Sequence, residues 1–247
     1  MEGKTATARE RARAEITADI LKAARIRLSQ HGPGELSLRA VARDVGMVSS
    51  AVYRYFRSRD ELLTALLIEA YNELGVAVEE ANAGVKDQSA YLERWLAACS
   101  AIRNWAVKHP GDYALLYGSP VPGYAAPQDT IPAATRVTLV LVRIVLDAHA
   151  DGARITSAPP NAPAGLESTL GSALDFVKAL GMDDSPDAPE VAQRTIMAWS
   201  TIFGTISFEL FGHLVGSVSD YDAYFDQVIV RLAAELGLRR RKTGRSH

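Results

Sequence analysis

Two short helical segments meet at a glycine within residues 38–56, and this arrangement limits the possible folds of the chain more than any other feature. The first segment, LRAVARDVG, follows Ser37, a residue type that caps helices, and ends at Gly46, which can adopt the left-handed backbone that stops a helix. The second segment, MVSSAVYRYF, begins almost at once, with Ser49 or Ser50 as its expected cap. Such a pair fits the helix-turn-helix, in which the second helix enters the DNA major groove.

The rest of the chain also has the pattern of helices. The helix before the pair is expected over residues 7–30 and opens with the capping-box pattern Thr7-x-x-Glu10; the helix after it, over 58–83, opens with Ser58-x-x-Glu61. Strict alternation of apolar and polar residues, the signature of a strand, is absent. We therefore predict an all-α protein with further helices near residues 89–108, 111–117, 130–150, 189–214 and 221–236. Loops rich in proline and glycine are expected after residue 117 and after residue 150.

Composition narrows the class of protein. At 247 residues and 48% hydrophobic content, the chain can bury a sizeable core. The only cysteine, Cys99, can form no internal disulfide, and no apolar run reaches the length of about 18 residues that a membrane span needs. The polar N-terminus does not resemble a secretory signal. We expect a cytoplasmic protein without a membrane partner.

Charge is distributed unevenly along the chain. Residues 1–60 contain 12 basic and 7 acidic residues, whereas residues 61–247 contain 15 basic and 22 acidic residues. A positive N-terminal part would attract an anionic partner such as DNA. The alternative is a solvated basic arm, and charge alone does not decide between the two.

The side chains of the second short segment suit contact with DNA. At helical spacing, Ala51, Val52 and Phe56 can pack inward. The outward and N-terminal positions are then left to Ser49, Ser50, Tyr53 and Arg54, and Tyr55 follows them. Hydroxyl groups commonly contact phosphates, and an arginine can also bind the edge of guanine with two hydrogen bonds.

The stretch from about Ile16 to Leu67, centred on AVARDVGMVSSAVYRYFRSRDELLTALL, resembles the N-terminal domain of TetR-family regulators. The resemblance implies a homodimer whose two recognition helices enter successive major grooves of a near-palindromic double-stranded operator, about 34 Å apart. It also implies the DNA-contacting positions, which are Arg39, Ser49, Ser50, Ala51, Tyr53, Arg54, Tyr55 and Arg59. Among these, Tyr55 would hold a phosphate, and Arg59 stands where the family has a phosphate-binding lysine. Met47-Val48 departs from the Val-Ser frequent in the family, so a hydroxyl could cap the recognition helix only after position 48.

Two later stretches, WAVKHPGDYALLYGSPVPGYAAPQDT and AWSTIFGTISFELFGH, are similar to a C-terminal domain found in a TetR subgroup. The resemblance implies a larger helical-bundle domain that binds a small ligand and dimerises, with the loop 119–124 over or beside a cavity. We accordingly expect a helix-turn-helix domain over residues 1–60, the ligand-binding and dimerisation domain over 61–238, and a basic, disordered tail over 239–247.

Effector pockets are lined mostly by apolar and aromatic side chains, with a few polar groups that orient the bound ligand. The ligand-binding candidates are Trp95, Arg103, Trp105, Tyr113, Tyr117, Tyr124 and Phe176, although ordinary core packing would explain most of the aromatic residues equally well. Arg103 lies among apolar residues, where a buried guanidinium would need an anionic or carbonyl partner. The last two helices carry apolar residues on more than one face, which predicts a homodimer formed through them.

An enzyme would need a constellation of catalytic groups, and the sequence contains no such pattern. The five histidines are scattered and none lies in a metal-binding or phosphate-binding motif, so we predict no catalytic residue, metal or cofactor. The expected function is that of a repressor released from its operator by a small-molecule effector. A ligand-responsive activator of the same fold, or a helical binding protein without operator specificity, remains an alternative.

Overall fold

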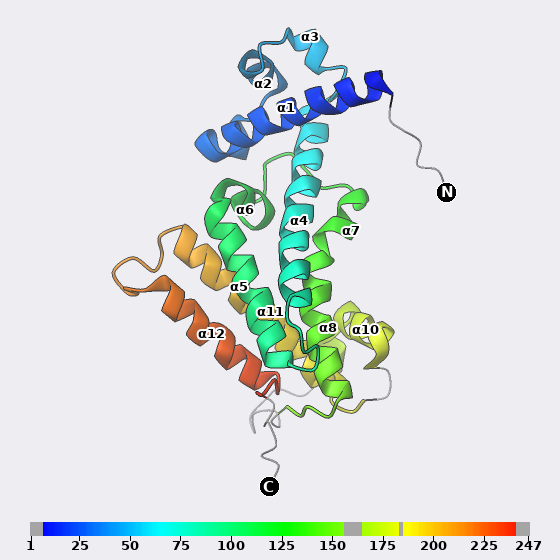
Figure 1. The fold of residues 1–247 in the computed structure, drawn as a ribbon, viewed down its shortest axis with the longest axis vertical. Helices are drawn as coiled ribbons and strands as arrows, with labels where there is room; N and C mark the ends of the chain where they lie inside the picture. Colours follow the sequence, from blue (N-terminus) through cyan, green and yellow to red (C-terminus); the bar gives the residue numbers. More distant parts are fainter. Residues whose placement is uncertain (1–6, 156–164, 183–184, 241–247) are drawn as a thin grey trace. The chain divides into compact units, whose positions relative to one another are not determined.

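The computed structural model describes residues 7–155, 165–182 and 185–240, and these residues form helices and loops without any strand. The all-α prediction is confirmed. The chain divides into two compact units (Figure 1): one contains residues 1–73 and 109–134, and the other contains residues 74–108 and 135–247. The first unit thus extends beyond the helix-turn-helix domain expected over residues 1–60, and helix α4 (Arg59–Ala83) contributes residues to both units.

The first unit begins with α1 (Ala8–His31), α2 (Leu38–Asp44) and α3 (Ser49–Val52), and it includes the first part of α4. The predicted capping box of α1 is present, since the Thr7 side chain accepts from the backbone of Glu10 and the Glu10 side chain accepts from that of Thr7. Ser37 caps α2 and Gly46 adopts a left-handed φ of 66°, both as predicted. Apolar side chains of these helices and of the turn after α3 form a shared core that includes Ile20, Leu28, Val41, Val52, Phe56 and Leu66.

Two details of this unit differ from the sequence-based expectation. The recognition helix was expected to reach Phe56, but α3 ends at Val52 and continues as turns, with the Tyr55 and Phe56 amides both donating to the Val52 carbonyl. The expected serine cap is also wrong: the N-cap residue is Val48, which has no side-chain hydroxyl to offer. A recognition helix of one turn leaves the following turns to carry Tyr53, Arg54 and Tyr55.

Helix α6 (Pro110–Tyr117) also belongs to the first unit, where it packs against α1. A Cβ added to Gly111 would lie only 2.9 Å from the Cα of Ser29, so the two helices meet backbone to backbone at this point. The unit is completed by the loop from residue 118, the 3-10 turn η2 (Gln128–Thr130) and the short helix α7 (Ile131–Ala134).

In the second unit, helix α5 (Tyr91–Lys108) packs against α8 (Arg136–Ala150), α11 (Ala188–Leu210) and α12 (Tyr221–Glu235) (Figure 1). Trp95 of α5 is fully buried, and its indole Nε1 donates a hydrogen bond to the carbonyl of Ile229 on α12 at 3.0 Å. Cys99, also on α5, is fully buried, and burial raises the pKa of its thiol. A neutral, inaccessible thiol acts here as an apolar core group.

The second half of the chain departs from the sequence-based boundaries in three places. The helix expected over 130–150 is broken at Thr135, which separates α7 from α8. Helices α9 (Leu166–Leu170) and α10 (Ser172–Val177), followed by the π-helical turn η3 (Lys178–Met182), occupy a stretch to which no helix was assigned. Helix α11 ends at Leu210 instead of continuing to residue 214.

Within the described residues, no helix combines the length and the apolar character needed to cross a bilayer. The basic tail was expected over residues 239–247. Of these, Arg239 and Arg240 are described, and Arg240 Nε lies 3.5 Å from Glu93 Oε1. Residues 241–247, and residues 156–164 of the expected second loop, lie outside the described part of the chain.

Candidate functional site

The outer surface of the helix-turn-helix carries most of the side chains expected to contact DNA. Tyr53 has 45% of its surface exposed, and Ser50 and Arg54 are also exposed, as is Arg39 on α2. Ser49, at the start of α3, is half-buried. The exposed groups offer hydroxyls and guanidinium donors, the groups that bind phosphates and base edges.

Two other residues expected to contact DNA, Ala51 and Arg59, are largely buried or hydrogen-bonded within the first unit. Ala51 is 9% exposed, so the open surface around it consists of its neighbours. Arg59, half-buried at the start of α4, donates from Nε to the carbonyl of Leu36 at 3.1 Å. This bond fixes the base of the guanidinium group and ties α4 to the segment before α2.

Arg13 on α1 joins this surface, although it was not among the expected residues. Its guanidinium lies 5.1 Å from the ring centroid of Tyr55, and its Nη2 donates to the carbonyl of Arg54 at 3.4 Å. Tyr55 itself is half-buried against the core. Arg13 therefore places an exposed positive charge beside the turn that carries Arg54 and Tyr55. The basic N-terminal sequence indicated such a charge but not which arginine supplies it.

The seven residues expected to contact a ligand do not gather in one place. Tyr113, Tyr117 and Tyr124 belong to the first unit, where the rings of Tyr113 and Tyr117 lie 5.2 Å apart and the Tyr124 hydroxyl is 2.9 Å from Thr64 Oγ1. The others belong to the second unit, in which Trp95 and Trp105 are buried side chains of α5 and Phe176 lies on α10.

Arg103 is buried on α5, and the anionic partners that its burial requires come from the chain itself. Its Nε and Nη2 donate to the two carboxylate oxygens of Glu209 at 2.7 Å each, and its Nη1 donates to Asp222 at 2.6 Å. The hydrogen bond with Glu209 is the main cause that raises the pKa of Arg103, with Asp222 adding to it and burial acting in the opposite direction. The guanidinium therefore stays charged and connects α5 to α11 and α12.

A cavity of about 140 Å³ lies in the second unit between α8, α10 and α11, and its lining is almost wholly apolar. Phe176, Ile196 and Trp199 are among its lining residues, and each is about 40% exposed. Of the seven ligand candidates, only Phe176 lines it. The remaining lining residues were missed, because most of them are small or aliphatic and carry no sequence signal of ligand binding; the full lining is Thr138, Val142, Ala173, Phe176, Val177, Ala192, Thr195, Ile196 and Trp199.

Comparison with known proteins identifies both parts of the chain. Residues 20–66 match the model of the bacterial regulatory proteins of the tetR family, and residues 95–232 match that of the tetracyclin repressor-like C-terminal domain. The HTH-type transcriptional regulator Rv1816 of Mycobacterium tuberculosis is 40% identical over 233 residues, which cover 92% of this chain and 96% of the relative. The chain belongs to the TetR family of transcriptional regulators.

Solved structures of similar fold agree with this assignment, among them that of the regulatory protein SCO4313. SCO4313 superposes with a TM-score of 0.70 at 31% identity, covering 92% of this chain and all of the other. PfmR, a TetR-family regulator of Thermus thermophilus, has the same fold at 15% identity, with a TM-score of 0.54, and the match covers 97% of this chain and all of the other.

Family membership makes the N-terminal helix-turn-helix a DNA-binding element and the C-terminal domain a ligand-binding one. The family and fold predicted from the sequence are both confirmed. The individual DNA-contacting and ligand-contacting residues stay predictions.

Proposed function

We propose that this TetR-family protein is a repressor that binds a near-palindromic operator as a homodimer and leaves it when a small apolar effector binds the second unit. The observation that carries the DNA-binding half of the proposal is the open surface around α3. There Ser50, Tyr53 and Arg54 are exposed together, next to Arg39 and Arg13. Because the proposed target is chromosomal DNA, we propose that the protein acts in the cytoplasm.

The dimer is proposed to form through α11 and α12. These helices and the segment just after α11 expose large apolar side chains, among them Met197 at 49%, Phe208 at 53% and Val230 at 45%. Apolar side chains exposed along two neighbouring helices favour dimerisation, which buries them against the same surface of a second copy. A twofold dimer also matches the symmetry of a palindromic operator.

The effector is proposed to be small, uncharged and mainly apolar. Among the described residues that line the cavity between α8, α10 and α11, only Thr138, Thr195 and Trp199 have polar side-chain atoms, and the Thr195 hydroxyl already donates to the Val191 carbonyl. A cavity of about 150 Å³ with an apolar lining is large enough for benzene. We propose that the protein binds such a molecule without transforming it.

Release from DNA is proposed to follow from a shift between two dimer geometries. An effector can shift that equilibrium only if it binds the geometry that does not fit the operator more tightly than the one that does. Helix α4 contributes residues to both units and is the element we propose to couple them.

The experiment that tests the repressor proposal begins with selection of DNA fragments by the purified protein, followed by binding titrations on the recovered sequence. Tyr53→Ala and Arg54→Ala should weaken binding, whereas Arg43→Ala should leave it unchanged, because Arg43 is an exposed residue of α2 that is not among the expected DNA contacts. Recovery of a near-palindrome supports the proposal. If no sequence is enriched, or if Arg43→Ala weakens binding as much as Arg54→Ala, the proposed DNA surface is wrong.

The effector is tested separately, with toluene, p-xylene and indole as probes, by their effect on the thermal unfolding temperature and on operator affinity. Ala192→Leu fills the cavity from α11 and should abolish the stabilisation by these probes, while Ala81→Leu on α4 should retain it. Stabilisation that persists in Ala192→Leu would place the ligand elsewhere.

A further inference from the structure

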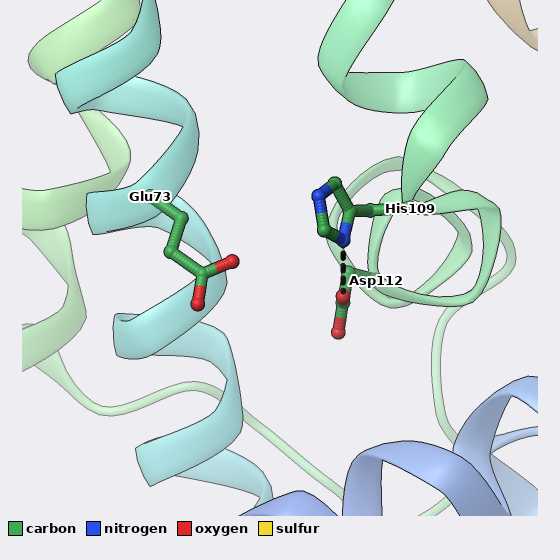
Figure 2. Close-up of side chains that lie close together, drawn as sticks. All are labelled: Glu73, His109 and Asp112. Carbon is green, nitrogen blue, oxygen red and sulfur yellow. Dashed lines mark ion pairs between the residues drawn. The ribbon is translucent and has the colours of Figure 1, made fainter.

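A side-chain cluster in the first unit brings together one imidazole and two carboxylates. Figure 2 shows Glu73 of α4 facing His109 and Asp112, which stand at the N-terminal end of α6. One ligand atom from each of the three residues lies within 4.8 Å of the other two. His109 is the N-cap residue of α6, yet its side chain makes no capping hydrogen bond; its Nδ1 lies 3.8 Å from Asp112 Oδ2.

Negative charge exceeds positive charge around this cluster. The Arg25 guanidinium contacts three carboxylates: Glu69 at 3.2 Å, Glu73 at 2.8 Å and Asp112 at 3.2 Å. Asp112 is only 4% exposed, and Arg25 is about 25% exposed. Glu69 and Glu73 are about 40% exposed and are solvated, so the excess negative charge is buried only at Asp112, where a further cation would offset it.

Asp112 is also incompletely satisfied. Its Oδ1 is buried and accepts no hydrogen bond, because the nearby Arg25 Nε lies within ion-pair distance but not in hydrogen-bond geometry. Its Oδ2 faces the ring of His109. The Arg25 charge is therefore the electrostatic partner of Oδ1, and Oδ2, on the side of His109, is the oxygen placed to bind a metal ion.

The donor set and its spacing suit a first-row divalent metal ion. Imidazole nitrogen and carboxylate oxygen both bind Zn²⁺ at roughly 2.0 to 2.2 Å, which places neighbouring donors of a tetrahedral site about 3.4 Å apart. His109 Nδ1 and Asp112 Oδ2 are already close to that separation. Glu73 pairs with Arg25 through Oε1 at 2.8 Å, which leaves Oε2 as the oxygen that we assign to the ion.

We propose that Glu73, His109 and Asp112 form a binding site for a divalent transition-metal ion of the Zn²⁺ class, with water completing its coordination. The ion offsets the excess negative charge beside Arg25 and binds the buried carboxylate of Asp112 through the oxygen that faces His109. Because Glu73 lies on α4 and the other two ligands lie at the start of α6, the ion cross-links these helices within the first unit. Mg²⁺, which prefers an all-oxygen octahedral shell, should bind much more weakly.

The test uses full-length, tag-free protein stripped of metal with a chelator and titrated with Zn²⁺ by calorimetry. The wild type should bind one equivalent. Loss of a residue that only hydrogen-bonds to a metal ligand typically weakens metal binding by roughly 10- to 100-fold. His109→Ala and Asp112→Asn each remove a proposed ligand itself, so each should weaken Zn²⁺ binding by at least that factor. His213→Ala, which removes an exposed histidine of the second unit, should bind as the wild type does.

Absorption spectra of the Co²⁺-loaded protein provide a second measurement, since loss of a ligand changes the d–d bands of the bound ion. Circular dichroism verifies that each variant is folded; if Asp112→Asn fails to fold, His109→Ala still decides, because His109 is 29% exposed at the helix end. Failure of the wild type to bind Zn²⁺ at micromolar concentration, or equal binding by wild type and His109→Ala, would overturn the proposal.

Discussion

Arg103 and Glu209 form a bidentate ion pair in the second unit, with both side chains only about 10% exposed. Removal of Glu209 leaves the buried Arg103 with the 86% exposed Asp222 as its carboxylate partner, and breaking a buried pair costs up to about 3–5 kcal/mol. We therefore expect Glu209→Leu to lower the free energy of unfolding by several kcal/mol, as measured by urea denaturation.

The double variant Arg103→Met/Glu209→Leu is the matched control for this pair. It removes both charges and fills the space with apolar groups, which is often neutral or stabilising. The exposed Asp222 would lose its partner but would remain solvated. If the double variant is more stable than Glu209→Leu, the two side chains form a paired, buried network. If its loss of stability equals the sum of the losses in Glu209→Leu and Arg103→Met, the two charges are not coupled.

Gly111 is predicted to be essential to the packing of α6 on α1. An alanine Cβ at this position would come within 2.9 Å of the Ser29 backbone, so the helices must separate, at a cost of about 1–3 kcal/mol for overpacking. Gly34→Ala is the control, because an added Cβ there meets no atom within 4 Å. Thermal unfolding should show a lower melting temperature for Gly111→Ala only; equal melting temperatures would refute the close contact.

Local features account for the parts of the fold that the sequence could predict. The capping box of Thr7 and Glu10, the cap at Ser37 and the left-handed Gly46 each depend on residues within a few positions of one another. These signals place α1 and α2 almost to the residue. The length of α3 depends instead on how Val52 and Phe56 pack into the core, and the helical pattern alone extended it too far.

Contacts between distant segments explain what the sequence could not predict. The membership of α6 in the first unit depends on the meeting of Gly111 with Ser29, which lie far apart in the chain. The cavity depends on small residues such as Ala173 and Ala192, whose contribution is the space they leave open. The apolar residues around Arg103 predict a buried charge that needs an anionic partner, but only the fold brings Glu209 and Asp222 next to it.

Arg13 is predicted to add a phosphate contact to the DNA-binding surface. Its guanidinium lies beside Tyr55 and the backbone of Arg54, at the edge of the exposed recognition turns. Arg13→Ala should weaken operator binding and reduce the slope of log affinity against log salt by about one phosphate contact. Arg143→Ala, which removes an exposed arginine from α8 in the other unit, is the control and should leave the slope unchanged.

The proposed dimer predicts a specific effect of charge on the α11 surface. Phe208→Glu replaces a 53% exposed aromatic ring with a charge and should convert the dimer into monomers. Light scattering after size exclusion should then give the mass of one chain, 26.7 kDa, in place of twice that mass. Operator affinity should fall with it, because each monomer reads only half a site. Val76→Glu changes a 42% exposed residue of α4 and should leave the dimer intact; a dimeric Phe208→Glu would exclude this part of α11 from the interface.

His149 predicts how stability depends on pH in the second unit. Its ring is buried on α8 beside the end of α12, where Nε2 lies 3.1 Å from the Leu236 carbonyl oxygen, and burial lowers the pKa of the imidazole. The unfolded chain binds a proton at this residue below a pH of about 6.5, whereas the folded chain disfavours the protonated form, so acidification through this range favours unfolding.

Urea denaturation of the wild type should therefore show a falling free energy of unfolding as the pH decreases below that value. His149→Gln can still donate to Leu236 but cannot take up the proton, so its stability should fall less on acidification; in His213→Gln, which changes an exposed histidine, the wild-type dependence should persist.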